Sequence, residues 1–165
     1  MSLTVARLRE LLHYNPEIGA WTRLVSRGGS KAGDRAGTVN PNLGYWLISV
    51  DNVVHYAHRL AVLYMTGEPP ATGTHVDHID GDRLNNTWSN LRVVTCSANL
   101  QNVRKGHRDS ATGVLGVSIC GRSGRYVAQI SRQGRHYHLG RFDTLDEARE
   151  AYIAAKRKLH EGCTI

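Results

Sequence analysis

Residues 75–102 of this 165-residue chain read HVDHIDGDRLNNTWSNLRVVTCSANLQN, a long polar run between two short apolar ones. The polar run and its flanks contain an Asp-His pair, an Asp-Gly-Asp turn and five asparagines. This pattern predicts a β-hairpin with a long polar loop, followed by a helix. The expected segments are a strand at residues 76–79, the loop at 80–90, a second strand at 91–95 and a helix at 97–103.

The polar side chains of this stretch meet the requirements of phosphodiester hydrolysis. That reaction needs a base for water, a hard cation that stabilises charge on the phosphate oxygens, and a scaffold that positions both. Histidine suits the first task at neutral pH, so His78 is the candidate general base. Carboxylate and amide oxygens suit Mg²⁺, with Mn²⁺ as the second choice, so Asp77 and Asn99 are the candidate metal ligands.

The pattern D-H-x-D-G-(x)-N-N-(x)-N-L-R-x-V-T-(x)-N resembles the HNH endonucleases, which share the ββα-metal fold. It is especially similar to the phage and intron homing endonucleases, in which the last motif position is asparagine. The resemblance covers roughly residues 45–103 and includes the upstream run AHRLAVLYMTG. It implies that Asp77 and Asn99 bind the metal, that His78 is the base, and that Asn90 orients the loop and the histidine.

Strand geometry limits how the Asp77-His78 pair can act. Adjacent strand residues point to opposite faces, so a regular strand does not direct both side chains to one site. We therefore expect one of the two residues at a strand end or at a bulge. The remaining polar residues are expected to be structural: Asp80-Gly81-Asp82 as a turn, Asn85 and Asn86 as loop formers, and Asn102 on a helix surface.

Upstream, the sequence predicts two helices among short strands. A stripe formed by Val5, Leu8 and Leu12 predicts a helix over residues 4–13, and a second helix is expected over residues 58–65. The expected strands lie at residues 20–25, 45–50 and 53–57. After the first of these strands, the Gly-rich basic run SRGGSKAGDRAG is either a flexible connector or a phosphate contact.

The last third of the chain predicts a domain of its own, with strands at residues 114–119, 126–131 and 135–142. In the third strand, alternation places Tyr137 and Leu139 inward. Thr144 and Glu147 are expected to form a capping box. The helix that they open carries an apolar stripe of Leu145, Ala148, Tyr152, Ala155 and Leu159. The prediction is three antiparallel strands packed on one helix.

This last part resembles the plant ethylene-response-factor (APETALA-type) DNA-binding domain. The shared landmarks are Gly116-Val117, Ala128 and Ile130, Leu139-Gly140 with Phe142, and the helix at residues 144–155. The resemblance implies an exposed sheet face that enters the major groove. Ser118 and Tyr126 stand where that family has arginine and tryptophan, so we expect phosphate contact rather than the base readout of the plant proteins. The candidate DNA-binding residues are Arg125, Gln129, His136 and His138 on the open sheet face, and Arg122, Arg132 and Arg135 at turns.

The charge distribution agrees with DNA contact by the C-terminal part. The chain has a net charge of +7. Residues 104–165 hold 12 Lys and Arg against 6 Asp and Glu, whereas residues 1–103 hold 9 against 8. Such an excess indicates either a polyanionic partner or a solubilising surface.

Cysteine content and hydropathy indicate the compartment. Three widely spaced cysteines, Cys96, Cys120 and Cys163, argue against a disulfide framework or a cysteine-rich zinc site. They favour a reducing cytoplasm, that of a bacterial or phage-infected host cell. No apolar run reaches the roughly 18–20 residues of a membrane helix, and the N-terminus does not resemble a signal peptide.

The sequence thus predicts an α+β protein of two modules. An N-terminal extension and HNH nuclease unit occupy residues 1–103, a linker residues 104–112, and the DNA-binding domain residues 113–165. The expected activity is metal-dependent, homing-endonuclease-like cleavage of double-stranded DNA, with neither a membrane nor an obligate protein partner. The main alternative is a non-catalytic DNA-binding regulator. An RNA-binding module is less favoured, because aromatic residues that stack on single strands are sparse.

Overall fold

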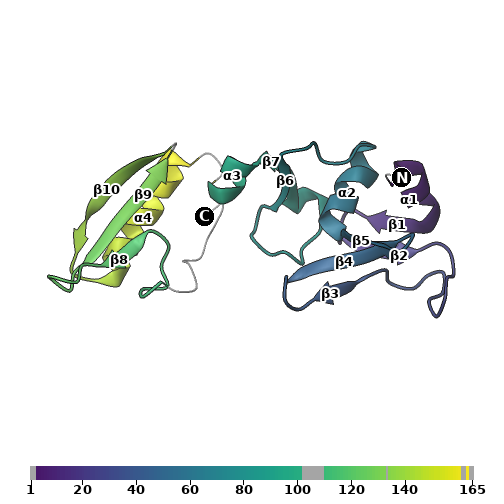
Figure 1. Ribbon diagram of the computed structural model, residues 1–165, viewed down its shortest axis with the longest axis horizontal. Coiled ribbons are helices and arrows are strands. Elements are labelled where there is room, and N and C mark those ends of the chain that lie inside the picture. The colour runs from purple at the N-terminus through teal and green to yellow at the C-terminus, as the bar shows by residue number, and fades with distance from the viewer. Residues whose placement is uncertain (1–2, 102–109, 133, 161–162, 164–165) are drawn as a thin grey trace. The chain divides into compact units, whose positions relative to one another are not determined.

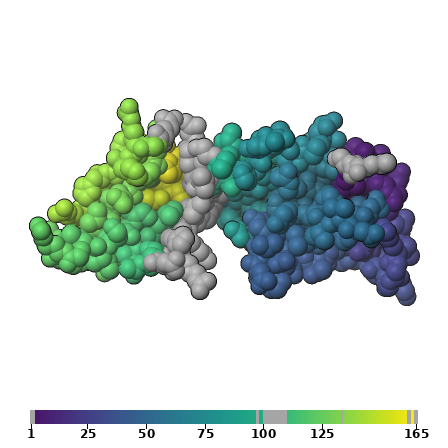
Figure 2. Space-filling model, viewed as in Figure 1, coloured from purple at the N-terminus to yellow at the C-terminus, as the bar shows by residue number. Residues whose placement is uncertain are grey.

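The computed structural model describes residues 3–101, 110–132, 134–160 and 163 and forms two compact units (Figure 1). The units are Met1–Cys96 and Ser97–Ile165, and each is closely packed where it is described (Figure 2). The architecture is mixed α+β, as predicted. Asn102, Val103 and most of the predicted linker, at residues 104–109, lie outside the described residues.

The first unit opens with helix α1 (Val5–Leu11), where the Thr4 side chain accepts a hydrogen bond from Arg7 N at 3.2 Å. The expected helix end at residue 13 was wrong. Strand β1 (Leu12–Asn15) begins directly after α1 and pairs antiparallel with β2 (Ala20–Arg23). Leu8 and Leu12 are both buried, so one apolar stripe continues from a helix into a strand.

A three-stranded antiparallel sheet with the order β3-β4-β5 follows. Its strands are β3 (Thr38–Asn40), which the sequence did not predict, β4 (Tyr45–Val50) and β5 (Val53–Tyr56). Asp51 and Asn52 join β4 to β5 with φ of 46° and 67°, the conformation of a tight two-residue hairpin. Helix α2 (Ala57–Thr66) begins directly after β5 and ends at Gly67.

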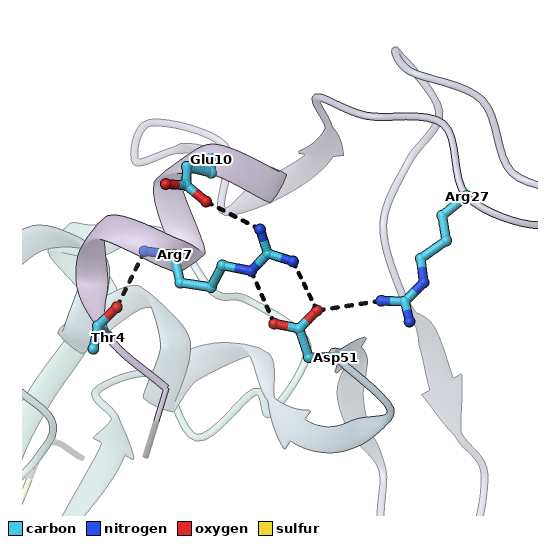
Figure 3. A network of polar contacts seen from close by, with 5 residues as sticks. All are labelled: Thr4, Arg7, Glu10, Arg27 and Asp51. Atoms are coloured by element: carbon cyan, nitrogen blue, oxygen red, sulfur yellow. Dashed lines mark hydrogen bonds and ion pairs between the residues drawn. The ribbon is translucent and has the colours of Figure 1, made fainter. Parts of the chain in front are cut away.

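Asp51 links this hairpin to two distant segments (Figure 3). Its carboxylate accepts hydrogen bonds from Arg7 Nε at 3.0 Å and Arg7 Nη2 at 3.1 Å, and from Arg27 Nη1 at 3.2 Å. The hydrogen bonds from Arg7, followed by its charge and that of Arg27, keep the pKa of Asp51 below its ordinary value. Because these side chains are exposed, the pairs add little stability. They also give Arg27, which lies in the Gly-rich loop, an ion-pair partner within the protein.

The predicted hairpin lies at the end of the first unit, and the predicted helix follows it at the boundary between the two units. Strand β6 (Thr74–His78) pairs antiparallel with β7 (Leu91–Thr95) in a continuous register. The loop between them closes with a single 3-10 turn at Trp88–Asn90. Helix α3 (Cys96–Gln101) follows β7 directly. The core of this unit includes Leu8, Tyr14, Trp21, Ile48, Leu60 and Leu91.

The second unit is a sheet packed on one helix, as predicted. Its strands, β8 (Val117–Ile119), β9 (Tyr126–Arg132) and β10 (Arg135–Phe142), are antiparallel in the order β10-β9-β8, and helix α4 (Leu145–Leu159) packs on them. The capping box is confirmed: Glu147 N donates to Thr144 Oγ1 at 3.3 Å, and Thr144 N donates to Glu147 Oε2 at 3.2 Å. Gly116, with φ of 72°, lies so close to the Tyr152 ring that a side chain would clash.

Strand β10 departs from the simple alternation that the sequence suggested. His138 pairs with Gln129 but Gly140 pairs with Ala128, so Leu139 forms a bulge. Leu139 and Phe142 therefore both pack on the core, while Arg141 is exposed opposite Val127. The inward placement of Tyr137 was only partly right: it lies opposite buried Ile130 but stays 39% exposed near the end of an edge strand. The first strand is also shorter than expected, beginning at Val117.

The three cysteines are free thiols. Among the described helices, none is long and apolar enough to cross a membrane.

Candidate functional site

Asn90 organises the loop between β6 and β7. Its side chain is buried, and its Oδ1 accepts a hydrogen bond from Asp80 N at 3.0 Å. Its Nδ2 donates to Asp80 Oδ1 at 2.9 Å and to Asn85 O at 2.8 Å. Its backbone oxygen accepts from Ile79 N at 2.8 Å. One asparagine thus connects the beginning, middle and end of the loop.

The acidic residues of the loop face its own backbone and amides. Asp80 accepts hydrogen bonds from Asp82 N at 2.8 Å and from Asn85 Nδ2 at 2.6 Å, and Asp82 accepts one from Leu84 N at 2.9 Å. Burial opposes ionisation of Asp80, but the hydrogen bonds from Asn85, Asp82 N and Asn90 outweigh it and lower its pKa. The predicted turn at Asp80-Gly81-Asp82 is confirmed.

The β1–β2 hairpin supports the loop from outside the motif. Tyr14 Oη donates to Asn86 O at 2.6 Å in a buried contact, and burial raises the pKa of this phenol to about 12. Trp88 N donates to Pro16 O at 2.8 Å. Gly19, with φ of 66°, lies directly against the backbone of Asn86, where any Cβ atom would clash. The N-terminal extension is therefore part of the scaffold of this site.

His78 is the last residue of β6, and its side chain is only 4% exposed. This confirms that one member of the Asp77-His78 pair lies at a strand end. Burial lowers the pKa of His78 below its ordinary value, against the opposing effects of the Asn86 hydrogen bond and of nearby acids. The imidazole is therefore neutral at neutral pH, the form that accepts a proton.

The contact with Asn86 indicates which ring nitrogen of His78 carries the proton. Asn86 Nδ2 donates to Leu84 O at 3.1 Å, which orients Oδ1 toward His78 Nε2 at 3.3 Å. An amide oxygen only accepts, so this contact is a hydrogen bond in the tautomer that carries the proton on Nε2. Asn86, expected only to shape the loop, also fixes the histidine.

A second buried histidine lies beside His78. His58, on α2, is 7% exposed, and its ring lies edge-to-face with that of His78 at a centroid distance of 5.1 Å. Tyr45 packs on both, with centroids 5.1 Å from His58 and 6.2 Å from His78. Burial, followed by the proximity of His78, lowers the pKa of His58 to about 3. Its Nδ1 is buried without a hydrogen-bond partner in the described part of the chain.

Asp77 and His78 have different partners across the hairpin. It pairs across the strands with Arg92, whereas His78 pairs with Leu91. Arg92 donates from Nε at 3.0 Å and from Nη2 at 2.8 Å to the same carboxylate oxygen, Asp77 Oδ2. Asp77 is 9% exposed, so this ion pair is largely shielded from water.

Asn99, the second candidate metal ligand, lies on α3 and is half-buried. Asn99 belongs to the second unit, whereas Asp77, His78 and Asn90 belong to the first. Across the described residues, no group of three or more His, Cys, Asp or Glu side chains is arranged to hold a metal ion. One carboxylate and one amide, completed by water, are a donor set that fits Mg²⁺.

The second unit presents a polar sheet face. Gln129 lies opposite His138, and Ser131 lies opposite His136, whose Nδ1 is 2.7 Å from Ser131 Oγ. All four are exposed. The bulge at Leu139 adds Arg141 to the same face. Arg122 and Arg135 are exposed in or beside turns, as predicted, and Arg132, at the end of β9, is half-buried. Arg125, which was predicted on the open face, forms an ion pair from Nε to Asp143 at 2.6 Å.

Sequence reasoning missed four residues of these sites: Tyr45, His58, Arg92 and Arg141. His58 lies inside the AHRLAVLYMTG run, but its proximity to His78 depends on the packing of α2 on the hairpin. The pairing of Arg92 with Asp77 follows from the register of the hairpin, so it was predictable once both strands had been assigned. The position of Arg141 on the exposed face depends on the bulge at Leu139, which no local sequence pattern predicts.

Comparison with protein families gives two matches, one in each part of the chain. Residues 55–101 match the HNH endonuclease family, and residues 112–162 match the AP2 domain. The chain carries an HNH endonuclease domain followed by an AP2 domain. No curated protein and no solved structure matches it.

The two domains indicate nuclease activity and DNA binding, respectively. HNH nucleases generally use a divalent metal. The matched HNH segment includes the end of β5, α2, the hairpin and α3, so both His58 and His78 lie inside it. The β1–β2 hairpin and β4, which contact the loop and His78, lie upstream of it.

Proposed function

We propose that this protein is a divalent-metal-dependent endonuclease that hydrolyses phosphodiester bonds of double-stranded DNA, in the manner of the homing endonucleases. The observation that carries the proposal is the state of His78, a buried and neutral imidazole with a fixed ring at the end of β6. A histidine that is neutral at neutral pH and held in one position can act as a general base.

In this proposal, His78 accepts the proton of the attacking water at Nδ1, while Nε2 keeps its hydrogen bond to Asn86. Asn90 keeps the loop in place, so the histidine does not need to reorganise during the reaction. Asp77 and Asn99 are the groups that would hold Mg²⁺, or Mn²⁺, and this cation would stabilise the charge that develops on the phosphate oxygens. The AP2 domain would keep the nuclease on the duplex.

The Asp77–Arg92 ion pair favours one alternative, a non-catalytic DNA-binding regulator. Arg92 holds the carboxylate that the metal would need, as expected if the HNH unit serves only as a scaffold. The pair also fits the nuclease, because an arginine that aligns a carboxylate with two hydrogen bonds can keep it oriented toward a cation.

A plasmid assay separates the two functions. The purified full chain is incubated with supercoiled duplex DNA in Mg²⁺, in Mn²⁺ and in EDTA. The proposal predicts nicked or linear product with a divalent metal and none in EDTA. Stable DNA binding without cleavage in either metal would establish the regulator instead.

A further inference from the structure

Arg83 is the cationic side chain that the loop presents near His78. Its guanidinium carbon lies 4.8 Å from the centroid of the Tyr45 ring, and its Nη1 donates to Leu43 O at 3.0 Å. The side chain is exposed. A ring contact and a carbonyl hydrogen bond together restrict a long side chain that would otherwise be mobile, so the charge is held in place before any ligand arrives.

Tyr45 connects this guanidinium to the candidate base. The Tyr45 centroid is 4.8 Å from the Arg83 guanidinium carbon and 6.2 Å from the His78 ring centroid, so the two groups are at most about 11 Å apart. Duplex DNA advances about 3.4 Å along its axis per nucleotide, so this distance corresponds to about three nucleotides or fewer. A phosphate contacted by Arg83 would thus lie close to the bond that His78 serves.

The surroundings of Arg83 leave its charge available. A guanidinium has five N–H donors, and the hydrogen bond to Leu43 uses one of them. The nearest acids in sequence, Asp80 and Asp82, accept hydrogen bonds from backbone groups of the loop itself. The first 103 residues carry only one more basic than acidic residue, so DNA contact in this unit depends on where its arginines lie.

We propose that Arg83 binds a backbone phosphate of the DNA strand beside the scissile bond and thereby positions that strand against His78. This inference rests on the proposed nuclease function and adds a substrate-binding residue to it. The recognised group is a phosphodiester oxygen, which a guanidinium binds with charge-assisted hydrogen bonds. Arg83 is therefore expected to contribute to affinity without selecting a sequence.

Arg9 provides a matched control within the same unit. Its guanidinium carbon lies 5.1 Å from the Tyr64 ring centroid, and its Nη2 donates to Tyr64 O at 2.6 Å. It therefore has the same two contacts as Arg83 but lies on α1, outside the loop. Loss of either arginine removes one positive charge and one ring contact, so only position distinguishes the two variants.

The test measures binding of the full chain to a duplex oligonucleotide by fluorescence anisotropy, in EDTA and over a series of salt concentrations. We expect Arg83→Ala to bind roughly five- to tenfold more weakly than wild type at moderate salt, with a slope of log affinity against log salt smaller by about 0.9. Arg9→Ala is expected to match wild type in both affinity and salt slope. The uncharged polar variant Arg83→Gln should show the same loss of affinity and of salt slope, and it replaces Arg83→Ala if the alanine variant folds poorly.

Wild-type affinity and salt slope in both Arg83 variants would overturn the inference. Because binding in EDTA requires no cleavage, this outcome is separate from failure of the plasmid assay, which bears on the nuclease function. Equal losses in the Arg83 and Arg9 variants would also contradict the inference, since they would indicate a general effect of charge.

Discussion

The two units of this chain use polar residues in opposite ways. In the first, Asp77, His78, Asn86 and Asn90 are each less than 10% exposed, and each hydrogen-bonds to a neighbour. In the second, the polar side chains of the sheet lie exposed on its surface. The difference matches the chemistry of the two families: a general base needs a fixed position and protonation state, whereas a phosphate-binding face needs accessible charge.

The largest expected effect on stability is that of Asn90→Ala. The substitution removes three partly buried side-chain hydrogen bonds and leaves Asp80 N and Asn85 O without this partner. We expect the free energy of unfolding of the first unit to fall by about 3 kcal/mol. All three tryptophans lie in this unit, so tryptophan fluorescence during urea unfolding reports on it alone.

Asn42→Ala, at an exposed position of the same unit, is the control for that experiment and should change stability by less than about 0.5 kcal/mol. A loss in Asn90→Ala no larger than in Asn42→Ala would contradict the view that Asn90 organises the loop.

The next effect is a pH dependence confined to the first unit. The pKa of His58 is lowered to about 3, so below pH of about 6.5 the unfolded chain binds a proton that the folded chain excludes. The contribution of His58 to stability is therefore fully present at neutral pH. As the pH falls below about 6.5, the free energy of unfolding decreases by about 1.4 kcal/mol per pH unit because of this residue. Between pH 8 and pH 5 the loss is roughly 2 kcal/mol.

His58→Phe keeps a ring of similar size and removes this titration. Urea unfolding is followed by tryptophan fluorescence at pH 8 and pH 5. Between these two pH values, the free energy of unfolding should fall by roughly 2 kcal/mol less in His58→Phe than in wild type. His13→Gln, at an exposed histidine of β1, should behave as wild type. An unchanged pH dependence in His58→Phe would show that His58 is not excluded from protonation.

Arg141→Ala tests the exposed side of the comparison. The bulge places Arg141 on the face of Gln129 and His138, so its loss should reduce the salt slope of DNA binding by about 0.9 without changing unfolding of the first unit. Arg149→Ala, at an exposed position of α4, is the matched control and should keep the wild-type salt slope. If the helix variant loses more affinity than the sheet variant, the sheet is not the binding face.

The smallest expected effect belongs to Asp143→Asn. Arg125 and Asp143 form an exposed ion pair, so its loss should change stability by less than about 0.5 kcal/mol. The substitution also releases Arg125 and removes a negative charge near the DNA, so affinity should rise roughly two- to threefold. Circular dichroism and anisotropy measure the two quantities. A fall in affinity, with Glu150→Gln unchanged, would indicate that Asp143 orients Arg125 for DNA.

Local patterns were sufficient to predict the parts of the fold that depend on short-range order. The stripe of Ala148, Tyr152 and their neighbours specified α4, and Thr144 with Glu147 specified its start. In the hairpin, apolar runs on either side of a polar loop specified β6 and β7. Each of these elements carries its own periodicity and its own end signals.

The features that sequence did not predict depend on contacts between distant segments. The stripe of Leu8 and Leu12 fits a helix, and only pairing with β2 turns Leu12 into a strand residue. Strand β3 is three residues long and depends on β4 for its pairing. The support of the loop by Tyr14 and Gly19 joins positions about seventy residues apart. No single-sequence pattern contains these contacts.

The candidate site was predictable in its residue types and less so in its arrangement. His78 lies at a strand end, as strand geometry required. The metal-ligand roles of Asp77 and Asn99 stay predictions, and the Arg92 ion pair was unexpected because charge pairing across strands requires the register.

The most direct test of the central claim compares cleavage and binding in His78→Ala. The purified variant and wild type are incubated with supercoiled plasmid in Mg²⁺, and their affinity for a duplex is measured by anisotropy in EDTA. We expect His78→Ala to lose nicking and to keep wild-type affinity, because the base lies in the buried site and the AP2 domain is unaltered. Full cleavage by His78→Ala would contradict it.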